Sequence, residues 1–254
     1  MPEFVIGAIW AFCWGIAAAS GALTGAILGL MTHLQHRAIA ALMSLAAGVL
    51  LSAASFKVAS EALVLAGAAS TTAGMIAGAA TFSILNAFLA TAKHRKRCGE
   101  CQTQPEEAKA PGSGHSIALG TALDAVPDAL VLGVTLRRGG ADLALVIALA
   151  LANVPKALSS TAGMRLACRP SSYVLRLWAS NTVCTAAMTS IAFSLFGDLD
   201  PYGAAILKAY GAGALIAMTA ETMIPEAVHN SPRYSGVLAG AGFAALVLIG
   251  ELAR

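Results

Sequence analysis

The chain contains 254 residues, of which 57% are hydrophobic and only 11% are charged, and its formal net charge is +3. Soluble globular proteins are about one quarter charged, so this chain has too little polar surface to cover itself in water. The composition therefore excludes an ordinary soluble protein. We predict a membrane protein whose partner is the lipid bilayer, and we expect no nucleic-acid partner.

A helix needs about 20 largely apolar residues to cross a bilayer, and eight stretches of the chain meet this requirement. They are residues 4–31, 38–63, 66–92, 115–136, 141–163, 172–197, 203–228 and 234–252. The first stretch lacks a basic leader and a cleavage site, so we expect a retained span rather than a signal peptide. The sequence predicts an all-α membrane protein, with residues 1–254 forming a single bundle of eight transmembrane helices.

The positions of the basic residues predict the orientation, because cytoplasmic loops carry an excess of Lys and Arg. With the N-terminus outside, the inner loops hold Arg37, Lys93, Arg95, Lys96, Arg97, Lys109, Arg165, Arg169, Arg176 and Arg233. The outer side keeps Arg137, Arg138, Lys208 and Arg254. We therefore expect a multi-pass protein of the cell membrane with both termini extracytoplasmic. Residues 93–114, rich in charge, Pro and Gly, are expected to form a flexible cytoplasmic loop.

Two similar segments place charges beside a proline within apolar stretches. Residues 123–133 read LDAVPDALVLG, and residues 151–161 read LANVPKALSST. Asp124 and Asp128 are four residues apart, so they share one face of a helix. A carboxylate at the centre of a span costs about 2.5–3.5 kcal/mol, so the pair needs a compensating cation. Lys156 and a bound metal ion both meet that need, and an Asp–Lys pair that only joins two helices is the plainer interpretation.

A third segment, AETMIPEAVHN at residues 220–230, carries two glutamates around Pro225. Glu221 lies deeper in its stretch, and we expect it to belong to the central site. Glu226 lies near the inner end with His229, where a gating or interfacial role is expected. On the second stretch, Lys57 and Glu61 are four residues apart and predict an interfacial ion pair, and Ser52 is expected to bond a backbone carbonyl.

These motifs resemble those of the ZIP (ZRT/IRT-like protein) family of divalent metal transporters. That family has eight spans, and its fourth and fifth spans carry motifs of the type His-Asn-x-Pro-[Asp/Glu]-Gly and [His/Gln]-[Asp/Glu/Asn]-x-Pro-Glu-Gly. This chain has DAVPDAL and ANVPKAL at those points, GAGALIAMTAETMIPEA resembles the seventh span, and LAAGVLLSAASF is similar to the second. The resemblance implies transport of zinc or a related metal toward the cytoplasm, through a mid-membrane site on spans 4, 5 and 7. The metal is then cargo, and no resident cofactor is expected.

The resemblance carries over to the site residue by residue. Asp124 stands where the family has its first His, and Asp128 matches the bridging carboxylate. Asn153 retains an oxygen donor, whereas Lys156 replaces the second bridging Glu. The implied metal ligands are Asp124, Asp128, Asn153 and Glu221, with Lys156 as a built-in surrogate cation. Such an oxygen-rich set is harder than the usual zinc ligands, which leaves Mn, Fe or Mg open as cargo.

Other positions depart from the family pattern. Ala125 and Ala152 replace residues that can bind metal, and Cys184 stands where the sixth span often has a Glu. The alternative is therefore a degenerate ZIP-fold protein that has lost metal transport or moves another solute. Cys98 and Cys101 form a lone CxxC, only half of a tetrahedral zinc site. No motif predicts an enzyme, although the two aspartates could share a proton, as the paired carboxylates of an intramembrane hydrolase do. The sequence leaves the oligomeric state open, and a homodimer is possible.

Overall fold

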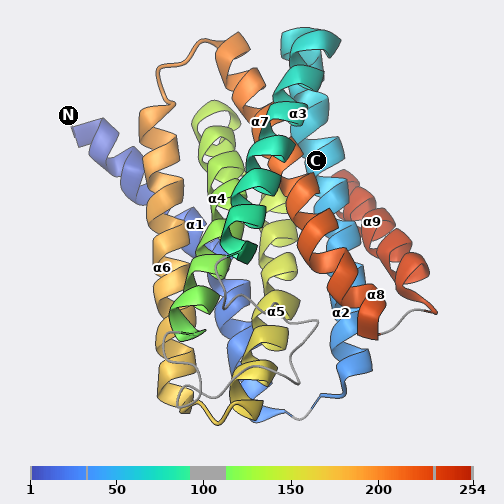
Figure 1. The fold of residues 1–254 in the computed structure, drawn as a ribbon. Coiled ribbons are helices and arrows are strands. Elements are labelled where there is room, and N and C mark those ends of the chain that lie inside the picture. The colour runs from blue at the N-terminus through green and yellow to red at the C-terminus, as the bar shows by residue number, and fades with distance from the viewer. Residues whose placement is uncertain (1, 33, 92–112, 231–232, 253–254) are drawn as a thin grey trace.

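The computed structural model describes residues 2–32, 34–91, 113–230 and 233–252, and these contain helices but no strand. The helices run roughly alongside one another in a single bundle (Figure 1). This all-helical architecture agrees with the predicted fold class. The predicted loop at residues 93–114 falls almost entirely outside the described residues, as do Cys98 and Cys101.

The helices follow one another with short connections. They are α1 Pro2–Met31, α2 His36–Ser52, the π-helix η1 Ala53–Ala59, α3 Ser60–Thr91, α4 Ser113–Gly139, α5 Leu143–Leu166, α6 Ser171–Leu195, α7 Pro201–Met218, the π-helix η3 Thr219–Met223, α8 Ile224–Asn230 and α9 Ser235–Leu252. Each range predicted as a span overlaps a helical segment. The π-helices lie inside continuous rods, one joining α2 to α3 and one joining α7 to α8.

The second and third predicted spans meet at a sharp turn within α3. Gly67 has φ +76° and ψ 168°, outside the helical region, and it divides the segment into two helices. Glycine adopts a positive φ without the steric penalty of a side chain. The chain therefore reverses at Gly67, and residues 68–91 run back along the bundle (Figure 1).

Not every helix is apolar enough to be called a span from its composition. Four described segments are both long and apolar enough to cross a membrane: Phe4–Met31, His36–Leu89, Leu143–Leu166 and Pro201–Val228. Ser235–Glu251 is a shorter apolar helix. These segments are typical of a helical membrane protein. The helix α4, by contrast, carries Asp124, Asp128, Arg137 and Arg138, and it packs mainly against α6 and α7.

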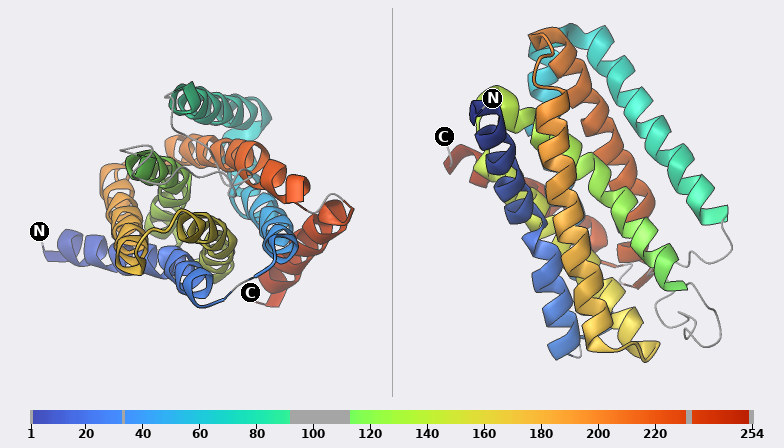
Figure 2. Two further views of the ribbon diagram at one scale, coloured as in Figure 1. Left: turned by 60° about the horizontal axis from the view of Figure 1, so that its bottom comes forward. Right: turned by 90° about the vertical axis from the view of Figure 1, so that its left-hand side faces the viewer.

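Small residues let the helices approach closely. The most extensive pairings are α3 with α7, α1 with α5 and α6, and α2 with α9, and the left view of Figure 2 shows these neighbours side by side. A Cβ built on Gly48 would lie 1.8 Å from the carbonyl oxygen of Ala239. One built on Gly242 would lie 2.0 Å from the carbonyl oxygen of Leu45. The helices α2 and α9 therefore meet through reciprocal glycines, as membrane helices often do.

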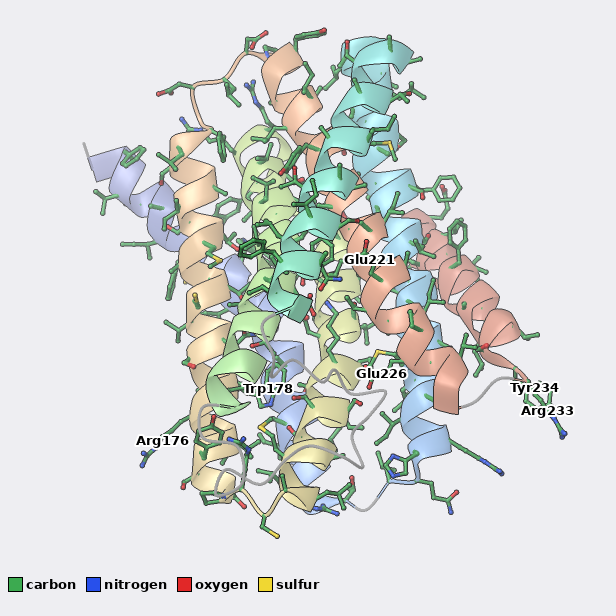
Figure 3. The ribbon with its side chains drawn as sticks, in the orientation of Figure 1. Arg176, Trp178, Glu221, Glu226, Arg233 and Tyr234 are labelled. Carbon is green, nitrogen blue, oxygen red and sulfur yellow. The ribbon has the colours of Figure 1, made fainter. Side chains whose placement is uncertain are left out.

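The connections divide between the two ends of the bundle. The turn at Gly67, the α4–α5 connection and the α6–α7 connection lie at one end (Figure 1). The α5–α6 connection lies at the opposite end, and Arg176 and Arg233 lie toward it in Figure 3. The described basic side chains that were assigned to the inner loops therefore lie toward the same end of the bundle.

Candidate functional site

The two proline motifs lie on helices that stay continuous. Pro127 lies inside α4 and Pro155 inside α5, yet each helix runs on for several turns beyond its proline. A proline removes one backbone hydrogen bond, and neighbouring helices in a bundle tolerate that loss. No break opens at either motif, so any ligand there is held by side chains rather than by an unwound backbone.

The motifs bring together three of the residues singled out in the sequence. Asp128 is 3% exposed, and its Oδ2 accepts a hydrogen bond from Asn153 Nδ2 at 3.4 Å. Lys156 Nζ lies 3.8 Å from the same carboxylate oxygen and donates to Asn153 Oδ1 at 3.4 Å. We call Asp128, Asn153 and Lys156 the central cluster. Its lysine offsets the charge of a carboxylate that is buried in an apolar bundle.

The seventh predicted span contributes a methionine to this cluster. Met218, at the end of α7, is fully buried, and its Sδ lies 3.7 Å from Lys156 Nζ. Sequence reasoning missed Met218, because a methionine among apolar residues is usually ordinary core. The cluster thus combines a carboxylate, an amide, an ammonium group and a thioether from three helices.

Asp128 has a second oxygen that the cluster does not use. Its Oδ1 is buried and has no hydrogen-bond partner among the described residues. Such buried polar atoms are rare and indicate a water molecule, an ion or a functional role. Asp124 is half-buried one turn earlier on α4, where its charge acts on Asp128. The two aspartates therefore present oxygen ligands on one face of the helix.

Glu221 points to a different neighbour. Its carboxylate accepts hydrogen bonds from the side chains of Ser83 and Asn86 on α3, the latter at 2.5 Å, and Figure 3 shows where it lies on the bundle. Glu221 belongs to η3, and the extra residue of a π-helix turns the following side chains by about 100°. In the described part of the chain, no three His, Cys, Asp or Glu side chains are grouped to hold a metal ion. The hydrogen bonds described for Glu221 therefore go to α3 rather than to the central cluster, and its role as a ligand stays a prediction.

Glu226 lies closer to the motif of α5 than the sequence indicated. Its carboxylate accepts a hydrogen bond from the hydroxyl of Ser159, which follows Lys156 by one turn of α5. Figure 3 places Glu226 further than Glu221 toward the end of the bundle that carries Arg176. The polar residues Ser83, Asn86 and Ser159 were not predicted, because single hydroxyl and amide groups in apolar helices give little sequence signal.

The remaining expectations fall into two groups. Ala125 and Ala152 are buried, and their methyl side chains have no atom that can bind a metal. Cys184 is exposed on α6, so it does not take the place of a ligand inside the bundle.

The expected pair of Lys57 and Glu61 is wrong: Lys57 pairs with Asp142 at 3.4 Å, and Glu61 pairs with Lys208. Each partner lies outside the helix that carries Lys57 and Glu61, so the spacing along that helix cannot reveal it.

A scan against models of known protein families found no match to this chain, and a search of curated proteins found none either.

Proposed function

We propose that this chain is a ZIP-like transporter that crosses the cell membrane eight times and moves a divalent cation toward the cytoplasm. The cation binds at the Asp124–Asp128 face of α4, where Asn153 supplies an amide oxygen. Because carboxylate and amide oxygens are hard ligands, manganese or iron fits this site better than zinc does. The motif resemblance supplies the direction of transport and the number of spans.

One observation carries this proposal. The buried Oδ1 of Asp128 has no partner among the described residues, although leaving a buried charged acceptor unsatisfied is costly. A cation at Oδ1 removes that cost, and Asp124 one turn earlier adds a second negative charge. An Asp–Lys pair that only joins two helices gives this oxygen no function.

Lys156 favours a second candidate function. Its ammonium group already lies 3.8 Å from Asp128 Oδ2, in the place where the family has a metal-bridging carboxylate. A built-in cation at this position suits a degenerate ZIP-fold protein that has lost metal transport. Transport measurements separate this candidate from the first.

Uptake of metal into proteoliposomes tests the proposal. We expect wild-type protein to carry Mn or Fe, and Asp128→Asn to lower uptake by at least about tenfold, since hydrogen bonds and ligation by charged groups are worth about 1.5–3 kcal/mol. Asp198→Asn serves as a control, because the Asp198 side chain is fully exposed. Absence of uptake of Zn, Mn, Fe, Co, Ni and Cd by the wild-type protein would instead support the degenerate candidate.

Cysteine labelling tests the proposed orientation. Cys168 lies exposed in the turn between α5 and α6, and Asp198 lies in the connection between α6 and α7 at the other end. In intact cells, an impermeant thiol reagent should label a protein whose only cysteine is Asp198→Cys. It should leave a protein with Cys168 alone unlabelled, and likewise one that keeps only Cys98 and Cys101. The reverse pattern would place the N-terminus in the cytoplasm.

A further inference from the structure

The ammonium group of Lys156 lies among three atoms of different chemistry. Its Nζ is 3.8 Å from the carboxylate oxygen Oδ2 of Asp128, 3.4 Å from the amide oxygen Oδ1 of Asn153 and 3.7 Å from the thioether Sδ of Met218. These residues belong to α4, α5 and α7, so three helices converge on one point. Carboxylate, amide and thioether groups all bind metal ions. The ammonium group therefore occupies a position that also suits a metal ion.

The orientation of the Asn153 amide is determined by its other contacts. Its Nδ2 donates to the carbonyl oxygen of Ala18 at 3.5 Å and to Asp128 Oδ2 at 3.4 Å. A backbone carbonyl oxygen can only accept a hydrogen bond, so the amide nitrogen must lie on that side. The amide oxygen is therefore directed toward Lys156 Nζ, where it can receive a cation.

Met218 is a poor partner for an ammonium group and a better one for a soft metal ion. It is fully buried at the end of α7, and its thioether sulfur is only a weak hydrogen-bond acceptor. The polarisable sulfur of methionine suits transition metals, whereas Mg²⁺ and Ca²⁺ take oxygen ligands. One soft atom beside two kinds of oxygen ligand favours an ion of intermediate softness.

Lys156 can give up its place to such an ion. Its side chain is 13% exposed, against 3% for that of Asp128, and its stem is flexible. A divalent ion brings one more positive charge than the ammonium group, and Asp124 one turn earlier on α4 supplies the second negative charge. Asp128 Oδ1 has no hydrogen-bond partner among the described residues, so both oxygens of this carboxylate are available to the ion.

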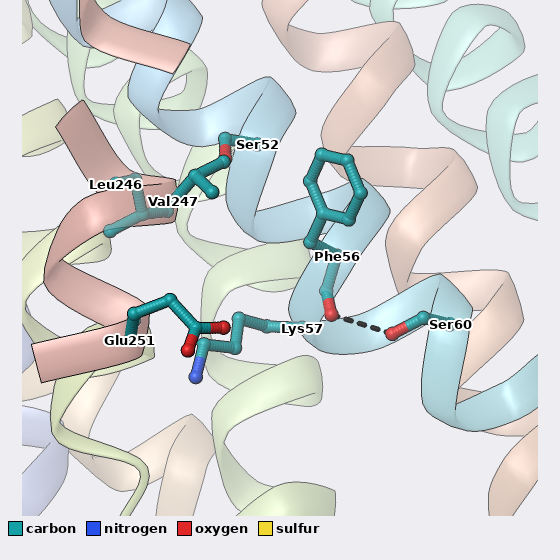
Figure 4. Close-up of a pocket in the computed structure, with 8 residues that line it drawn as sticks. Ser52, Phe56, Lys57, Ser60, Leu246, Val247 and Glu251 are labelled. Carbon is teal, nitrogen blue, oxygen red and sulfur yellow. Dashed lines mark hydrogen bonds between the residues drawn. The ribbon is translucent and has the colours of Figure 1, made fainter. Parts of the chain in front are cut away.

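A pocket of about 300 Å³ between α9 and the α2–η1 segment is a second polar space in the bundle (Figure 4). Lys57 in its wall pairs with Asp142 at 3.4 Å, and Glu251 lies beside Lys57 in Figure 4. The buried Ser52 Oγ has no hydrogen-bond partner in the described part of the chain, so its expected bond to a backbone carbonyl is wrong. None of the residues that line this pocket has a sulfur atom or an imidazole. It therefore offers no soft ligand that competes with the central cluster.

We propose that Met218 is a ligand of the transported cation and makes the site select Fe²⁺, or a neighbouring transition-metal ion, over Mg²⁺ and Ca²⁺. The ion takes the position of the Lys156 ammonium group and is bound by Asp128, Asn153 and Met218. This inference rests on the proposed transport function and narrows its cargo. Oxygen ligands alone also suit Mg²⁺ and Ca²⁺, so the sulfur atom carries the selectivity.

Anaerobic calorimetry of the full-length purified protein tests this proposal, with Fe²⁺, Cd²⁺ and Mg²⁺ as probes. All cysteines are replaced with serine, so that no thiol binds the soft ions; the described cysteines are exposed. Met218→Leu keeps the side chain apolar and of similar volume. It should weaken Fe²⁺ binding by about tenfold and Cd²⁺ binding by more, since even indirect partners of a metal contribute about 10–100-fold. Mg²⁺ binding should change by less than about twofold, because Mg²⁺ takes oxygen ligands.

Met164→Leu is the matched control. Met164 is a fully buried methionine of α5, and it belongs to the apolar core formed with α1 and α6 rather than to the central cluster. Its replacement should leave the binding of all three ions unchanged. Equal losses in Met164→Leu and Met218→Leu would show that core packing, not ligation by sulfur, causes the effect.

The outcomes separate this inference from the proposed function. If the cysteine-free protein binds none of the ions, or if Asp128→Asn leaves their binding unchanged, the transport site and the role of Met218 are both wrong. If binding depends on Asp128 but Met218→Leu binds Fe²⁺ and Cd²⁺ as tightly as before, only the role of Met218 is wrong. X-ray absorption at the cadmium edge detects the ligands without the Met218 variant, and we expect a sulfur neighbour. A shell of oxygen and nitrogen alone would overturn the inference, even if Met218→Leu fails to fold.

Discussion

Replacing Lys156 with alanine is expected to lower the free energy of unfolding by about 3–5 kcal/mol, the usual cost of breaking a buried ion pair. The carboxylate of Asp128 is 3% exposed, so water cannot replace the lost ammonium group. Asn153 remains as a donor to Oδ2, but one neutral amide does not offset a full charge. Thermal unfolding of the purified protein measures this loss.

Matched variants separate the ion pair from general effects of charge removal. Arg176→Ala removes a cation from an exposed position on α6, and it should change stability by less than about 0.5 kcal/mol. The double variant Asp128→Leu with Lys156→Met should recover much of the stability, because apolar residues of similar size often replace a buried pair without loss. A Lys156→Ala protein as stable as wild type would show that Lys156 does not neutralise Asp128.

The substitution Lys156→Glu should act differently. It restores the carboxylate that the ZIP motif has at this position, and it places a further negative charge beside Asp128. Three carboxylates near one point need a cation, so we expect Lys156→Glu to bind divalent metal more tightly than wild type. A larger thermal shift on addition of Zn or Mn measures this gain. If the Lys156→Glu protein showed neither a metal-dependent shift nor altered stability, Lys156 would not belong to the site.

Replacing Gly242 with alanine is expected to destabilise the packing of α9 on α2 by about 1–3 kcal/mol, the usual cost of overpacking. The added Cβ would lie 2.0 Å from the carbonyl oxygen of Leu45 and 2.9 Å from its carbonyl carbon. These are backbone atoms of a buried helix, so they cannot rotate away as a side chain can. The helices must separate, and the reciprocal contact of Gly48 with Ala239 weakens with them.

Gly240→Ala is the control in the same helix. A Cβ at Gly240 meets nothing within 4 Å, and alanine favours a helix over glycine by about 1 kcal/mol. We expect this variant to be neutral or slightly more stable than wild type. Limited proteolysis after α8, with thermal unfolding, follows the release of α9. If both variants behave alike, helix propensity rather than close approach determines the effect.

Several features of this protein could be derived from the sequence alone. The apolar stretches predicted the helices, because a chain with so few charges can satisfy its backbone in lipid only by local hydrogen bonds. The repeated segments around Pro127 and Pro155 indicated that α4 and α5 carry matching polar groups at the same depth. That symmetry is why Asp124, Asp128, Asn153 and Lys156 were expected to converge. The structure brings Asp128, Asn153 and Lys156 together at distances of 3.4–3.8 Å, and the place of Asp124 in the site stays a prediction.

Other features depended on the tertiary structure. Met218, at the end of α7, reaches Lys156, whereas Glu221 in the π-helix η3 bonds Ser83 and Asn86. A π-helix has no simple sequence signature, so the local pattern could not predict this choice. The partners of Lys57 and Glu61, and the pocket between α2 and α9, likewise depend on which helices pack together. Helical spacing relates residues within one helix, whereas contacts between helices depend on close approach at residues such as Gly48 and Gly242.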